Sequence, residues 1–154
     1  MAWSSSVPEA YDALMGLLLS AASLEDVRIL DGPVVTEDAI MEAVIVGFED
    51  ESVSAVEEGT NEPEGLSRAR DFETFTINCA ALVLLGSSTD MPTARRRVYE
   101  LFGAVGEVLA EDPRLGGAVG MATLGSHTLT QPQTPQGALA QVAFGVDCRS
   151  YSRR

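Results

Sequence analysis

The fold is decided by residues 72–85, FETFTINCAALVLL, where apolar residues recur at every second position from Phe75 to Leu85. One side of the alternation is apolar throughout: Phe75, Ile77, Cys79, Ala81, Val83 and Leu85. The other side begins with Thr74, Thr76 and Asn78 and becomes apolar only near the end. Because successive side chains of a strand point to opposite faces, the pattern predicts a central strand, wet on one face at its start and buried at its end.

A helix is predicted directly after this strand. Thr89 or Asp90 is a typical N-cap, and Pro92 suits the first turn of a helix. Helical spacing then places these apolar residues on one face: Ala94, Val98, Leu101, Phe102, Val105 and Leu109. The helix is expected to stop at Asp112, because a residue before proline avoids the helical region.

The flanking segments complete the predicted order of elements. A first helix begins near Ser6, a suitable cap, with Tyr11, Leu14, Met15 and Leu18 on its apolar face. Short strands follow at residues 27–30 and 43–48, the second with Val44, Val46 and Phe48 on one side. Residues 118–129 and 137–151 are expected to form a hairpin, joined by a stiff, exposed loop at 131–136. Two helices would then cover one face of a mostly antiparallel sheet, an α+β two-layer fold.

The length of 154 residues supports a single domain spanning residues 1–154. Its 23 acids against 10 bases give a net charge of −13, which argues against a protein that grips duplex DNA. The apolar run at residues 14–19 follows acids rather than bases and is too short to span a bilayer, so neither a secretory signal nor a membrane anchor is expected.

One segment departs from the rest in composition. Residues 49–64 contain acids but no base, together with the structure breakers Gly59 and Pro63. We interpret the stretch, within about residues 49–70, as an extended hairpin arm or a solvated loop, with residues 52–56 briefly stranded. Its acids are Glu49, Asp50, Glu51, Glu57, Glu58, Glu62 and Glu64.

No constellation of residues predicts catalysis, a cofactor or a metal site. Ser126 and His127 are adjacent on a predicted strand, so they point to opposite faces and do not pair as nucleophile and base. Cys79 and Cys148 are separated in apolar runs and are expected to be buried free thiols. The only basic cluster is Arg95, Arg96 and Arg97, which is either a solvated helix face or a contact with acids of a neighbouring subunit.

Two long segments carry a family resemblance. Residues 75–117, FTINCAALVLLGSSTDMPTARRRVYELFGAVGEVLAEDPRLGG, join a long strand through a bend of small residues to an arginine-bearing helix. Residues 129–151, LTQPQTPQGALAQVAFGVDCRSY, add a turn leading into an alternating strand. Together with DGPVVTED at 31–38 and AVIVGFED at 43–50, they resemble the tail-terminator proteins of long-tailed double-stranded DNA phages.

The resemblance implies a structural protein of the virion that is not an enzyme and has no cofactor. Members form a hexameric ring on the last ring of the tail tube, end tube growth, and offer the surface on which the head docks. The implied partners are further copies of the chain, the tail tube protein and the head–tail connector protein, with DNA passing through unbound. Assembly is expected in the host cytoplasm, and the final location is the head-proximal end of the tail.

Within such a ring, Glu57, Glu58, Glu62 and Glu64 are expected to line the lumen, where their charge would keep DNA from binding; the alternative is a loop on the outer rim. Two other functions stay open at this point. The chain is alternatively another connector or neck protein of the virion, or a small acidic α+β enzyme or ligand-binding domain.

Overall fold

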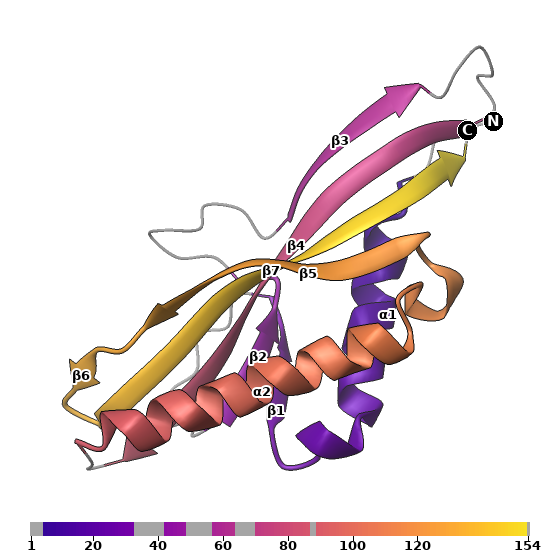
Figure 1. Cartoon of the computed structure of the whole chain (residues 1–154). Coiled ribbons are helices and arrows are strands. Elements are labelled where there is room, and N and C mark those ends of the chain that lie inside the picture. Colours follow the sequence, from indigo (N-terminus) through magenta and orange to yellow (C-terminus); the bar gives the residue numbers. More distant parts are fainter. Residues whose placement is uncertain (1–4, 33–41, 49–56, 64–69, 87–88, 154) are drawn as a thin grey trace.

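The computed structural model describes residues 5–32, 42–48, 57–63, 70–86 and 89–153 (Figure 1). These residues form two α-helices, two short 3₁₀ helices and seven strands. In chain order the elements are α1 (Val7–Ser20), η1 (Ala22–Leu24), β1 (Arg28–Asp31), β2 (Glu42–Val46), β3 (Glu57–Pro63), β4 (Arg70–Gly86), α2 (Met91–Glu111), η2 (Leu115–Gly117), β5 (Met121–Thr130), β6 (Gln133–Thr134) and β7 (Gly137–Arg153). No helix of the described part is long and apolar enough to cross a membrane.

The centre of the sheet is the antiparallel pair β4 and β7, which stay in register from Arg70↔Arg153 to Gly86↔Gly137. The strand order is β1-β2-β4-β7-β5, with β6 on β7 and β3 on β4. Strands β2 and β3 share one side of β4: β2 pairs with its second half and β3 with its first half. Only the pair β1–β2 is parallel among the described strands. The predicted α+β fold with a mostly antiparallel sheet is confirmed.

Both helices pack against one face of this sheet and form the main core with it. From the helices, Leu14, Leu18, Val98 and Leu101 are at most 1% exposed. From β4, the predicted apolar face is buried from Phe75 to Val83, and the alternating residues of β7 from Ala138 to Cys148 lie beside it. Burying each large side chain of this kind contributes about 1.5–3 kcal/mol relative to leaving it in water.

The limits of α2 agree with the prediction. Asp90 is the N-cap, and its carboxylate accepts a hydrogen bond of 3.1 Å from the backbone N–H of Thr93. The helix ends at Glu111, with Asp112 as its C-cap directly before Pro113.

The start of α1 differs from the prediction, because a different side chain accepts the hydrogen bonds there. Ser6 occupies the N-cap position, but its hydroxyl makes a hydrogen bond with the hydroxyl of Ser150 on β7 instead of capping α1. The carboxyl group of Glu73 on β4 accepts from the Ser6 N–H at 2.8 Å and from the Ser5 hydroxyl at 2.6 Å. The interpretation of Ser6 as a side-chain cap was therefore wrong, because an acceptor distant in sequence holds the helix start.

The alternation predicted for residues 43–48 breaks at Gly47. The amides of Gly47 and Phe48 both donate to the carbonyl of Asn78, at 2.9 and 2.7 Å, which is a β-bulge. Val44 and Val46 lie in the main core, whereas Phe48 packs with Ile45 on the opposite face of the sheet. Gly47 has a φ of +83°, a conformation that glycine adopts without strain.

Three segment boundaries also differ from the prediction. The hairpin strand expected from residue 118 begins at Met121, because η2 and a turn occupy the preceding residues. The expected loop at 131–136 contains β6, which pairs with the start of β7 through Thr134↔Gly137. In the acidic segment Glu57–Pro63 is a strand paired with β4, while the brief strand expected at 52–56 lies outside the described residues.

Candidate functional site

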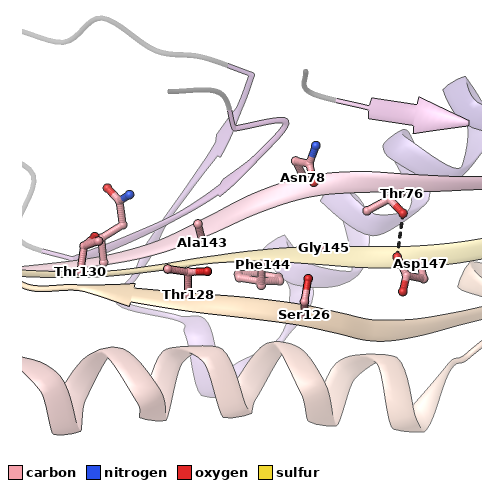
Figure 2. Close-up of a pocket in the computed structure, with 10 residues that line it drawn as sticks. Thr76, Asn78, Ser126, Thr128, Thr130, Ala143, Phe144, Gly145 and Asp147 are labelled. Atoms are coloured by element: carbon pink, nitrogen blue, oxygen red, sulfur yellow. Dashed lines mark hydrogen bonds between the residues drawn. The ribbon is translucent and has the colours of Figure 1, made fainter. Parts of the chain in front are cut away.

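A polar hollow of about 300 Å³ lies on the face of β4, β7 and β5 that the helices leave uncovered (Figure 2). Its polar side chains are hydroxyls, amides and one carboxylate, and the rest of the lining is apolar or glycine. The lining residues are Thr76, Asn78, Ser126, Thr128, Thr130, Gln141, Ala143, Phe144, Gly145 and Asp147. They come from three adjacent strands because alternate positions of paired strands share a face.

The carboxylate in this hollow is held by its neighbours. Thr76 Oγ1 donates to Asp147 Oδ1 at 2.7 Å across the β4–β7 pair. A Cβ at Gly125 would lie 2.5 Å from Asp147 Oδ2, and one at Gly145 would lie 2.7 Å from the methyl group of Thr76. The two glycines therefore make room for this pair, and the arrangement is that of an exposed, satisfied sheet face.

The hollow does not bring together Ser126 and His127, the nucleophile and base considered from the sequence. Ser126 lines the hollow, whereas the ring of His127 lies on the α2 side, 4.9 Å from the ring of Phe102. Their placement on opposite faces is as predicted. Within the described ranges there is also no group of three His, Cys, Asp or Glu side chains that could hold a metal ion.

Both cysteines are free and buried, as predicted. Burial raises the pKa of the Cys79 thiol to about 12, and burial together with the nearby Asp147 does the same for Cys148. A thiol with such a pKa is almost wholly protonated at neutral pH and is a poor nucleophile.

The arginine cluster at the start of α2 divides into two parts. Arg97 is held within the chain: its Nη2 lies 3.0 Å from Glu42 Oε1 on β2, and its Nη1 lies 2.9 Å from Glu100 Oε2. Arg95 and Arg96 are exposed. Arg95 Nη1 donates to the side-chain carbonyl of Gln131 at 3.0 Å, a neutral partner.

Three of the four acids expected in a lumen lie in β3, which pairs with β4 on the side where β2 does not reach. Their backbone positions are Glu57 opposite Ile77, Glu58 opposite Thr76 and Glu62 opposite Phe72. Glu64 lies outside the described residues. Along β4, β3 therefore lies at the first half, whereas Arg97 is bound to Glu42, whose backbone is opposite Val83 in the second half.

A second surface runs between α2 and β5, and sequence reasoning did not identify it. At its centre the rings of Tyr99, Phe102 and His127 contact one another, with centroids 4.9–6.2 Å apart. It continues into an almost wholly apolar hollow of about 260 Å³. The lining residues of that hollow are Gly106, Leu109, Ala110, Pro113, Met121, Ala122, Thr123 and Leu124. We call this surface the α2–β5 seam: it comprises the side of α2 that faces β5 from Arg95 onward, Pro113 beyond the helix end, and residues 121–124 and His127 of β5.

The seam exposes two large side chains of the kind found in interaction surfaces. Met121 is 47% exposed and Tyr99 is 37% exposed, although both are large and apolar in most of their area. Aromatic residues and methionine are enriched in protein–protein interfaces. The usable signal in the sequence was the spacing of Tyr99, Gly103, Gly106 and Ala110, which recurs every three or four residues outside the predicted apolar face.

Comparison with known proteins gives little further identification. No protein-family model matches the chain, and no curated protein does. Among solved structures, the chain is similar to one described as "Virion of native gene transfer agent (GTA) particle". That similarity has 9% sequence identity and a TM-score of 0.38, and it covers 92% of this chain and 91% of the other. At this identity and TM-score the similarity establishes neither a family nor a function.

Proposed function

We propose that the chain is a structural protein of a phage virion, a tail terminator that caps the tail tube as a hexameric ring and provides the head-docking surface. The residues that resemble this family, at 75–117 and 129–151, fall on β4, α2, β5, β6 and β7, which form most of the sheet and one helix layer. The proposal therefore rests on the elements that build the domain rather than on a peripheral motif.

The observation that best supports an assembling protein is that the sheet has exposed edge strands. Strands β3 and β5 each pair with one strand only within the described part of the chain, β3 with β4 and β5 with β7. An edge strand presents unpaired N–H and C=O groups, to which another chain can add. Repeated contacts between different surfaces of identical copies close into a ring when the rotation between neighbours allows it. The two hollows described above are open, and neither combines a nucleophile with a base, which favours an assembling protein over an enzyme.

The test is the mass and shape of the purified chain, alone and mixed with the tail tube protein of the same phage. A terminator forms a ring of six 16.3 kDa copies, about 98 kDa, by native mass spectrometry, and the ring binds tube ends in negative-stain images. A ring that binds a portal or connector protein but never tube ends would make the chain a different neck protein. A monomer that does not assemble under either condition would contradict the proposal.

We further propose that the acids of the segment around β3 face the lumen of this ring. DNA carries about one negative charge per 1.7 Å of its axis, so an acidic wall repels it and a basic wall would retain it. At physiological salt the repulsion extends only over roughly 8–10 Å, so it acts on DNA inside the bore and not beyond it. The alternative position for the segment is the outer rim of the ring.

The lumen proposal is tested by changing Glu57, Glu58, Glu62 and Glu64 to Gln in the phage. We expect tails of normal length that eject DNA more slowly, because the neutral glutamines repel the DNA less strongly from the wall of the lumen. A matched comparison removes two charges at a time: Glu57→Gln with Glu58→Gln is set against Glu25→Gln with Asp26→Asn, which are exposed and lie outside the α2–β5 seam. Normal ejection with failed tail assembly would place the segment at a subunit or tube contact, and the lumen proposal would be wrong.

A further inference from the structure

The outward face of α1 carries acids at one end and an apolar residue at the other. Its inner face, with Ala10, Leu14 and Leu18, is buried in the core. Its exposed side chains include Glu9 and Asp12 near the helix start and Leu19 near the end. Leu19 is 64% exposed, more than any other large hydrophobic residue that the structure describes. A single exposed leucine is ordinary on a protein surface, so the feature that matters here is its position on the same helix as the two acids.

The α2–β5 seam has the complementary order of features. It begins with the exposed cations Arg95 and Arg96, continues with the ring of Tyr99, and ends in the apolar hollow beside Gly106. Gly106 has no side chain, so the hollow reaches the backbone of α2, and a Cβ there would lie 3.1 Å from the Leu124 side chain. Cations therefore stand at one end of the seam, and a space for an apolar side chain lies at the other.

The spacings on the two surfaces match. Glu9 and Leu19 are separated by ten residues, and so are Arg96 and Gly106. At a rise of 1.5 Å per residue, each separation is about 15 Å along its helix. A copy of α1 laid parallel to α2 over the seam would thus bring its acids to the arginines and its leucine to the hollow at the same time.

The outward face of α1 and the α2–β5 seam are different surfaces of one chain. Leu19 does not line the hollow of its own chain, so the leucine that fills the hollow has to come from another molecule. A contact between them joins the face of one copy to a different face of the next. Contacts of this head-to-tail kind build rings or filaments instead of closed pairs. The occupant of the seam is therefore expected to be a second copy of this chain, and each copy can offer its own α1 to the next.

We propose that α1 of one copy docks in the α2–β5 seam of its neighbour, with Glu9 and Asp12 against Arg95 and Arg96 and with Leu19 in the apolar hollow. This contact rests on the proposed ring function and supplies its subunit interface. Arg97 is not part of it, because its guanidinium is bound to Glu42 and Glu100 within the chain.

The test is a charge reversal on each side and then on both, with assembly measured by native mass spectrometry over a range of concentrations. Glu9→Arg with Asp12→Arg should raise the concentration needed for half assembly by about tenfold or more, because like charges then face each other. Arg95→Glu with Arg96→Glu should do the same. All four changes together restore opposite charges and should bring assembly back to near the wild-type level.

A mismatched combination is the control. Glu9→Arg and Asp12→Arg are combined with Arg28→Glu and Arg114→Glu, which are exposed and give the same net charge without restoring the contact. This variant should stay defective, and circular dichroism should show that every variant is folded. A variant of the docking helix, Leu19→Asp, should also weaken assembly.

The outcomes separate the inference from the proposed function. If the wild type forms rings and the one-sided reversals assemble equally well, or the four changes together do not restore assembly, the contact is wrong and the ring proposal stands. If the wild type remains monomeric alone and with tube protein, both the contact and the proposed function are wrong.

Discussion

Replacing Gly47 by alanine should destabilise the protein far more than the loss of a glycine alone explains. With a φ of +83°, an alanine here costs about 1–2 kcal/mol in backbone strain. Its Cβ would also lie 1.7 Å from Tyr11 Oη and 2.8 Å from Tyr11 Cζ, so the ring of Tyr11 has to move. That movement breaks the hydrogen bond from the Tyr11 hydroxyl to the carbonyl of Val46.

The structure allows the cost to be divided. The lost hydrogen bond is worth about 1 kcal/mol, and forcing a ring out of a packed position costs about 1–3 kcal/mol. With the backbone strain, the total is about 3–6 kcal/mol, a large part of the 5–15 kcal/mol that holds a typical domain folded. Gly32→Ala is the matched control, because Gly32 has a similar φ of +77° but nothing within 4 Å of its Cβ position. It should cost only the strain, about 1–2 kcal/mol.

Urea denaturation followed by circular dichroism measures both variants against the wild type. For an m-value of about 2 kcal/mol/M, Gly47→Ala should lower the midpoint by about 1.5–3 M and Gly32→Ala by less than about 1 M. Adding Tyr11→Ala to Gly47→Ala removes the clash, so the double variant should lose less stability than the sum of the two single variants. Equal losses for Gly47→Ala and Gly32→Ala would refute the reasoning, because the tyrosine would then not be packed over Gly47.

Three further predictions concern buried and paired groups. Glu73→Ala should lower the free energy of unfolding by about 2–4 kcal/mol, since it leaves the buried N–H of Ser6 and the half-buried hydroxyl of Ser5 without their acceptor, and Glu73→Gln should restore part of the loss in the same urea assay. Because burial raises the pKa of Cys79 and Cys148 to about 12 from a usual value of 9.0, their stabilising contribution is complete below about pH 9 and is lost as the pH rises toward 12. Alkaline unfolding curves should show this loss, and rapid reaction of native thiols with a disulfide reagent at pH 8 would contradict it. Arg97→Ser should cost up to about 1 kcal/mol and Arg96→Ser nearly nothing by thermal unfolding, because the Arg97 guanidinium is paired with Glu42 and Glu100 whereas Arg96 is exposed.

The sequence predicted those elements in which one face is buried and the other is wet, because this difference produces a regular spacing of apolar residues. The alternation of residues 72–85 identified β4, and the helical spacing with its cap and proline identified α2, because these elements have one wet and one buried face along most of their length. Strand β3 lacks such a pattern: Glu57–Pro63 contains acids, glycine and proline, and it is a strand because the first half of β4 has a side that β2 does not occupy.

The features that were missed depend on partners distant in sequence. The helix start at Ser6 is held by Glu73, and Phe48 changes face because of a bulge opposite Asn78. The α2–β5 seam combines residues that each fit an ordinary role alone, such as Met121 in a strand and Gly106 in a helix. Only the packing of α2 beside β5 makes them one surface.

The position of β7 in the chain has a consequence for synthesis. It is the central partner of both β4 and β5, yet it is the last of the seven strands to leave the ribosome. About 50 residues separate the end of β4 at Gly86 from its first partner in β7, Gly137. At 5–20 residues per second, β4 waits for roughly 3–10 s with that side unpaired. During translation the nascent chain therefore exposes a 17-residue strand edge with a strongly apolar second half, and it is in this interval that a chaperone would protect it from aggregation.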